Sequence, residues 1–153
     1  MTASLAPVGL LSFRGPEKTA SSSIVRPDAT LTERAPTWFD AVARKCFSFV
    51  ELENNWDSYG GRPVHESVAQ AAADLLSRLA RPFTAEPTVV PTSGGGIQIE
   101  WRTSKVDLEI EFASAGRISA LFENRATGQT WEEEFESDLG LLVEAVGQLT
   151  ASR

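Results

Sequence analysis

Cysteine and histidine are almost absent from this chain, and their scarcity excludes several classes of site. The sequence contains one cysteine, Cys46, and one histidine, His65. A single cysteine excludes an intramolecular disulfide and a zinc site built from several cysteines, and a single histidine excludes a His-rich metal cluster. No apolar run approaches the roughly 18 residues of a membrane-spanning helix, and no Lys or Arg precedes the apolar stretch near Met1. We therefore expect a cytoplasmic protein without a cofactor.

Positive charge is also in short supply. The chain carries 14 Lys and Arg against 21 Asp and Glu, which gives a formal net charge of -7. Binding to nucleic-acid phosphates requires clustered positive charge, so the balance argues against direct contact with nucleic acid. The short apolar runs predict no membrane partner either. The charge balance permits a basic protein partner.

The first 35 residues differ in composition from the rest of the chain. They contain Pro7, Pro16 and Pro27 and a run of three serines, without sustained helical or strand periodicity. Such composition is typical of a terminal segment without regular structure. We therefore predict a flexible N-terminal tail over residues 1–35 and a single folded domain over residues 36–150.

Apolar residues at spacings of three and four predict three helices in that domain. Pro36 suits the first turn of the first helix, and Cys46 lies on its apolar side as a buried, unreactive thiol. Pro63 opens the second helix, and either Ser137 or Asp138 caps the third. The expected helices span about residues 37–53, 63–81 and 137–149.

Between the second and third helices the apolar period changes from helical to two, which is typical of strands. The expected strands span about residues 88–90, 97–102, 106–112, 118–123 and, more weakly, 131–135. The links between them are short enough for hairpins. We predict a two-layer α+β fold, in which about three helices cover the apolar face of an antiparallel four- to five-stranded meander.

Two short motifs stand out in the middle of the chain. One is a Trp-Asp-x-Tyr-Gly-x-x-Pro loop, here Trp56 to Pro63, and the other is a Gly-Gly-Ile-x-Ile/Leu-Glu-Trp strand, here Gly95 to Trp101. Over about residues 50–112 the chain thereby resembles a group of small uncharacterised bacterial proteins associated with mobile or phage-derived regions. The resemblance implies a shared evolutionary unit and brings no activity or catalytic residue with it.

The loop between the first two helices combines turn-forming residues with aromatic side chains. Trp56, Asp57, Tyr59 and Arg62 belong to residue types that suit a recognition site, so the 56–63 loop is one candidate binding site. The same residues also suit a rigid connector in which Trp56 fills the core and Asp57 caps the turn.

Carboxylates dominate the outward positions of the predicted strands. Between Gln98 and Glu136 there are nine acidic and four basic residues. This acidic face could dock a basic partner, mimic a nucleic-acid backbone, or act only as a solvated surface that prevents edge-to-edge aggregation. The candidate binding residues are Glu100, Asp107, Glu109, Glu111 and Glu123, with Glu132, Glu134 and Glu136 joining them if the last strand forms.

The carboxylates of the predicted strands give little indication of a catalytic site. Glu109 and Glu111 could hold Mg²⁺ or Ca²⁺ together with Glu100 or Asp107, but catalytic carboxylate pairs generally need a concave, desolvated site. We therefore predict no catalytic residue and a non-enzymatic protein that binds another macromolecule, in the manner of an antitoxin, immunity protein or inhibitor. A metal-dependent enzyme using the strand carboxylates and a structural subunit of a larger bacterial or phage assembly stay open as alternatives.

Overall fold

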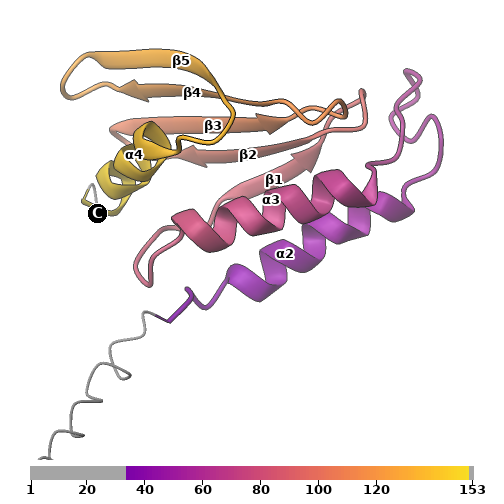
Figure 1. Ribbon diagram of the computed structural model, residues 1–153, viewed down its shortest axis with the longest axis horizontal. Helices are drawn as coiled ribbons and strands as arrows, with labels where there is room; N and C mark the ends of the chain where they lie inside the picture. Colours follow the sequence, from indigo (N-terminus) through magenta and orange to yellow (C-terminus); the bar gives the residue numbers. More distant parts are fainter. Residues whose placement is uncertain (1–33, 152–153) are drawn as a thin grey trace, which may run out of the picture. The chain divides into compact units, whose positions relative to one another are not determined.

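Three α-helices, one 3₁₀-helix and five β-strands make up the part of the chain that the structure describes (Figure 1). The structure is a computed structural model, and it describes residues 34–151. The tail predicted for residues 1–35 therefore lies almost wholly outside the described residues. In chain order the elements are α2 (Phe39–Ser48), the 3₁₀-helix η3 (Phe49–Glu51), α3 (Glu66–Leu79), β1 (Thr88–Pro91), β2 (Ile97–Arg102), β3 (Val106–Phe112), β4 (Ile118–Asn124), β5 (Gln129–Phe135) and α4 (Gly140–Ala151).

The strands form one antiparallel sheet in the order β1-β2-β3-β4-β5, so each strand pairs with its neighbour in sequence. Ile99 of β2 stands opposite Val89 of β1 and Ile110 of β3, and Ile110 stands opposite Ala120 of β4. Because side chains alternate between the two faces of a strand, this register collects the apolar residues on one face. The α+β class and the meander are confirmed, with five strands.

One hydrophobic core joins that apolar face to the helices. Ile99, Ile110, Phe112 and Phe122 of the sheet each expose 2% of their surface or less, and they form one buried cluster with Leu76 of α3 and residues of α2 and α4. In Figure 1, α2 and α3 lie side by side next to β1 and β2, and α4 packs against β3. The burial of these side chains is the main stabilising contribution to such a domain.

The first helix ends earlier than its apolar spacing predicts. It stops at Ser48, continues as η3 to Glu51, and Leu52 is extended, whereas a helix to residue 53 was expected. The reason is a long-range hydrogen bond, because the Phe49 carbonyl accepts from the Val64 amide at 3.1 Å and from the Leu52 amide at 3.4 Å. Those bonds replace the intrahelical bond to residue 53 and turn the chain into the following loop.

The second and third helices both begin later than expected. The backbone of His65 is extended and its Nδ1 accepts a hydrogen bond from the Ser67 amide at 3.1 Å, so α3 begins at Glu66 rather than at Pro63. Asp138 accepts from the Gly140 amide at 2.9 Å at the start of α4, which confirms the capping role predicted for it.

Two indole groups tie the connection between α3 and β1 to the core. Trp38 Nε1 donates to the Thr84 carbonyl at 2.8 Å, and Trp101 Nε1 donates to the Ala85 carbonyl at 2.7 Å. Trp101 is only 2% exposed, so its ring fills the core while its polar atom satisfies a loop carbonyl. The tryptophan of the predicted strand motif is therefore a structural residue.

Candidate functional site

The loop from Asn54 to Pro63 is built around the carboxylate of Asp57. One oxygen, Oδ1, accepts from the Tyr59 amide at 2.9 Å and from the Gly61 amide at 2.7 Å. Asn55 and Ser58 adopt left-handed backbone conformations, with φ of 66° and 68°, which non-glycine residues rarely adopt. The side-chain oxygen of Asn55 also accepts from the Gly60 amide at 2.7 Å. These bonds confirm that Asp57 caps the turn, and they give the loop one defined conformation.

This loop docks on the turn between β1 and β2, more than 30 residues further along the chain. The Arg62 amide donates to the Ser93 carbonyl at 3.0 Å, and the Arg62 guanidinium donates to the Gly94 carbonyl at 2.8 Å. The Ser93 hydroxyl donates to the second carboxylate oxygen of Asp57. This hydroxyl and the Tyr59 amide, in that order, hold the pKa of Asp57 below its ordinary value of 3.8.

The two aromatic residues of the loop take opposite positions. Trp56 is half-buried and its indole Nε1 donates to the Arg62 carbonyl at 3.0 Å, so it closes the loop and is not part of the hydrophobic core. The predicted alternative in which Trp56 fills the core is wrong, because the ring stays within its own loop. Tyr59 is 90% exposed at the tip of this loop. The loop therefore presents one aromatic ring to solvent on a well-ordered support.

The face of the sheet opposite the core carries the predicted carboxylates, and we call it the outward face. Its central row, read across β2 to β5, is Glu100, Glu109, Leu121 and Glu132. Leu121 is 48% exposed and stands between Glu109 and Glu132. The flanking rows are Gln98, Glu111, Ser119 and Glu134 on one side and Arg102, Asp107, Glu123 and Thr130 on the other.

Two arginines neutralise part of the outward face. Arg102 lies 3.0 Å from Glu100 and 3.8 Å from Glu109, and Arg125 lies 2.7 Å from one oxygen of Asp107. The hydrogen bond that Arg102 donates to Glu100, together with the negative charge of Glu100, raises the pKa of Arg102, and Asp107 does the same for Arg125. Three of the five predicted binding carboxylates thus have an arginine partner.

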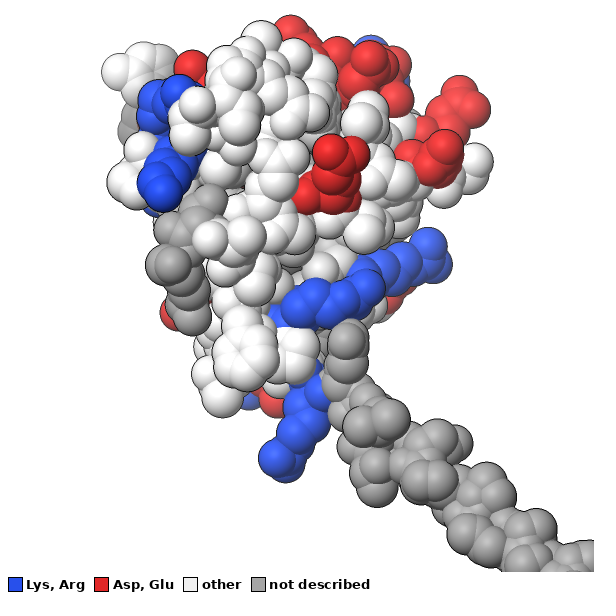
Figure 2. All heavy atoms as spheres, turned by 90° about the vertical axis from the view of Figure 1, so that its left-hand side faces the viewer, with Lys and Arg blue, Asp and Glu red and all other residues white. Residues whose placement is uncertain are grey.

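Three other carboxylates of the outward face form no ion pair among the described residues, whereas Glu134 lies 3.6 Å from Arg117 and the charge of Glu123 acts on Arg125 at longer range. Within residues 34–151, no ion pair joins Glu111, Glu123 or Glu132 to a basic side chain. Figure 2 shows carboxylates along the upper margin of its view, the margin on which Figure 1 places β4 and β5. These unpaired groups retain the long-range attraction for cations that paired groups lose.

The outward face is hollowed on both sides of Leu121. One hollow of about 230 Å³ is bordered by Glu100, Arg102, Asp107, Glu123 and Leu121 among others. A smaller one of about 110 Å³ is bordered by Glu109, Glu111, Ser119, Leu121 and Glu132 among others. Leu121 borders both hollows and is 48% exposed. Leu121 alternates with the buried residues Ala120 and Phe122, a period-two signal that could have placed it on the outward face.

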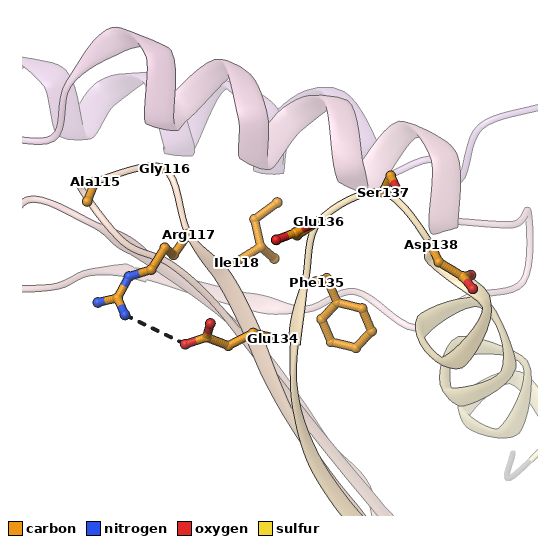
Figure 3. Close-up of a pocket in the computed structure, with 9 residues that line it drawn as sticks. All are labelled: Ala115, Gly116, Arg117, Ile118, Glu134, Phe135, Glu136, Ser137 and Asp138. Atoms are coloured by element: carbon orange, nitrogen blue, oxygen red, sulfur yellow. Dashed lines mark ion pairs between the residues drawn. The ribbon is translucent and has the colours of Figure 1, made fainter.

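A larger hollow of about 710 Å³ opens at the end of the sheet, between the β3–β4 turn and the β5–α4 connection (Figure 3). Among the charged groups that line it, Arg117 lies 3.6 Å from Glu134 and Asp138 accepts a hydrogen bond from the Gly140 amide, whereas Glu136 has no ion pair within the described residues. Phe135 and Ile118 contribute apolar surface to its wall.

Metal and nucleophile chemistry gain no site from the tertiary structure. In the described part of the chain, no group of three or more His, Cys, Asp and Glu side chains is placed to hold a metal ion. Cys46 is fully buried, and burial raises the pKa of its thiol to about 11. His65 is engaged as the N-terminal cap of α3. Among the described helices, none combines the length and the apolar character needed to cross a membrane.

Comparison with known proteins provides no family for this chain. No family model matches the sequence, and the searches of curated proteins and of solved structures found no match. The likeness of its two motifs to small bacterial proteins therefore stays a prediction.

Proposed function

We propose that this protein acts in the cytoplasm by binding a basic protein partner through the outward face of its sheet, without catalysing a reaction. Such a role corresponds to that of an antitoxin, an immunity protein or an inhibitor. The single observation that carries the proposal is the setting of Leu121. It is an exposed apolar residue with hollows on both sides, bordered by carboxylates of which Glu111, Glu123 and Glu132 lack an ion pair within the described residues.

The arrangement of this face supports binding in two separate ways. An apolar centre surrounded by polar groups is the usual anatomy of a protein interface, in which the centre supplies most of the affinity. The unpaired carboxylates increase the rate of encounter with a positively charged surface and disfavour acidic competitors. Tyr59 offers a second exposed anchor on a preorganised loop, which lowers the entropy cost of any contact it makes.

The test compares two variants of equal net charge in a pull-down from the source organism. The first reverses the three unpaired carboxylates, as Glu111→Lys, Glu123→Lys and Glu132→Lys. The second is a control that reverses Glu53, Glu86 and Glu144, which are exposed and lie outside the outward face. We expect the wild type and the control to retain a stoichiometric basic protein at low salt and to release it at high salt. The first variant should lose it.

Leu121→Ser separates the apolar contribution from the charge. It leaves every carboxylate in place, so loss of binding would assign affinity to the apolar centre. Equal retention of the partner by all variants, or recovery of this protein alone, would contradict the proposal. Thermal stabilisation by Mg²⁺, Mn²⁺ or Ca²⁺ in the absence of a partner would instead favour a metal-dependent role.

A further inference from the structure

The two edges of the sheet are not equivalent. β1 has four residues, ends in Pro91, which has no amide hydrogen, and contacts α2. β5 has seven residues, contains neither proline nor glycine, and pairs only with β4 among the described strands. In Figure 1, β5 lies at the margin of the sheet farthest from α2 and α3. A strand of this kind leaves a row of backbone donors and acceptors free to pair with an added strand.

The side chains of β5 define what an added strand would meet. Glu132 and Glu134 stand on the outward face, because they pair across the ladder with Leu121 and Ser119. On the other face Trp131 stacks on Phe122, with ring centroids 5.3 Å apart, and makes an edge contact with Phe135 at 6.0 Å. A strand added beside β5 would therefore have Glu132 and Glu134 next to it on one face, and the rings of Trp131 and Phe135 with Glu133 between them on the other.

Charge decides between the possible occupants of this edge. Three consecutive glutamates, Glu132 to Glu134, lie along β5, and Glu134 alone of the three has an ion pair within the described residues, an exposed one with Arg117. Pairing of two β5 edges from two copies of this chain would bring these glutamates together, and like charges across a strand pair repel. The edge is thus protected against self-association and is complementary to a basic strand.

We propose that the free edge of β5 binds an extended segment of the partner protein by strand addition. The segment carries two basic residues separated by one position, opposite Glu132 and Glu134, and flanking apolar residues opposite Trp131 and Phe135. This apolar-basic-x-basic-apolar order reads the same in both directions, so it fits a parallel or an antiparallel strand. The inference rests on the proposed function for the basic character of the partner, and it adds the conformation and residue order that the partner must have.

The test uses a blocked seven-residue peptide, Ser-Val-Lys-Thr-Lys-Val-Ser, and a second peptide of the same sequence that is N-methylated at its five central residues. Both peptides have the same charge, but the five central amides of the second cannot donate hydrogen bonds. We expect binding of the first peptide to slow hydrogen exchange at the β5 amides. The methylated peptide should bind at least about tenfold more weakly, because several hydrogen bonds are lost together.

Matched protein variants locate the site. Glu132→Gln with Glu134→Gln should weaken binding of the unmethylated peptide by about tenfold, because two charge-assisted contacts are lost. The control, Glu53→Gln with Glu86→Gln, removes two exposed carboxylates away from the sheet and should leave the affinity unchanged.

Three results would overturn strand addition. They are equal affinity of the two peptides, absence of binding by the unmethylated peptide at millimolar concentration, and a loss of affinity on Glu111→Gln with Glu123→Gln that the β5 variant does not show. The third would move the basic contact to the centre of the outward face and leave the proposed function standing. The pull-down with the lysine variants tests that function separately, since it requires no strand.

Discussion

Replacing each of the three consecutive glycines, Gly94 to Gly96, with alanine should change the stability of the protein very differently, although the substitution is the same. An added Cβ at Gly94 would meet no atom within 4 Å. Gly95 has a left-handed backbone with φ of 85°, and its Cβ would lie 3.3 Å from the Pro63 carbonyl oxygen. At Gly96 the Cβ would lie 2.3 Å from the carbonyl oxygen of Phe112, a backbone atom of the neighbouring strand that cannot swing away. The three positions therefore test space and backbone conformation separately.

These distances set the expected changes in the free energy of unfolding. Gly94→Ala should stabilise the protein by about 0.4–1 kcal/mol, because alanine restricts the unfolded chain and meets no obstacle in the folded one. Gly95→Ala should destabilise it by about 1 kcal/mol, the cost of a left-handed alanine partly offset by that same entropy. Gly96→Ala should cost about 3 kcal/mol, since β2 and β3 must separate locally to accept the methyl group.

Urea unfolding followed by tryptophan fluorescence measures this series directly. Small domains have urea m values of about 1–3 kcal/mol/M, so the expected differences shift the midpoint by measurable amounts. The midpoints should fall in the order Gly94→Ala, wild type, Gly95→Ala and Gly96→Ala. If Gly94→Ala were as damaging as Gly96→Ala, or if Gly96→Ala unfolded at the wild-type midpoint, the packing described for this turn would be wrong.

Three further predictions concern other parts of the domain. Ser93→Ala removes the hydroxyl that does most to lower the pKa of Asp57, so that pKa should rise toward 3.8 in an NMR titration. Because folding lowers the pKa of Asp57, the ionised carboxylate stabilises the fold above its unfolded pKa, and this stabilisation is lost as pH falls through the folded pKa. In the variant the folded pKa is higher, so the stabilisation should be lost at higher pH. An unchanged titration of Asp57 would count against the role of Ser93. Trp101→Phe should lower the free energy of unfolding in urea by about 2 kcal/mol, and Trp56→Phe by less than about 1 kcal/mol, because of the two only Trp101 is buried in the core. A larger effect of Trp56→Phe would contradict these positions. Cys46 should react with a thiol reagent only as the protein unfolds, because the thiol is buried and its pKa is about 11, and rapid labelling in native buffer would show that the helix opens.

Local periodicity predicted the sheet well, because a strand repeats every two residues whatever surrounds it. Glu100, Glu109 and Glu111 alternate with apolar neighbours, and all three lie on the outward face in the structure. The ends of the helices were less predictable. The early end of α2 depends on the Val64 amide reaching the Phe49 carbonyl, a bond between residues far apart in sequence.

The features of the candidate sites also separate into those set by the local sequence and those set by long-range contacts. The sequence alone determined which residues could face outward and how acidic that face would be, and it offered Asp57 as a cap of its own turn, since each property depends on residue type and near neighbours. Only the tertiary structure decided that Arg102 and Arg125 neutralise part of the face, that Leu121 projects between two hollows, and that Ser93 and Gly94 hold the 54–63 loop. These outcomes depend on contacts between segments that no local period relates, and strand register and loop docking specify them only once the chain has folded.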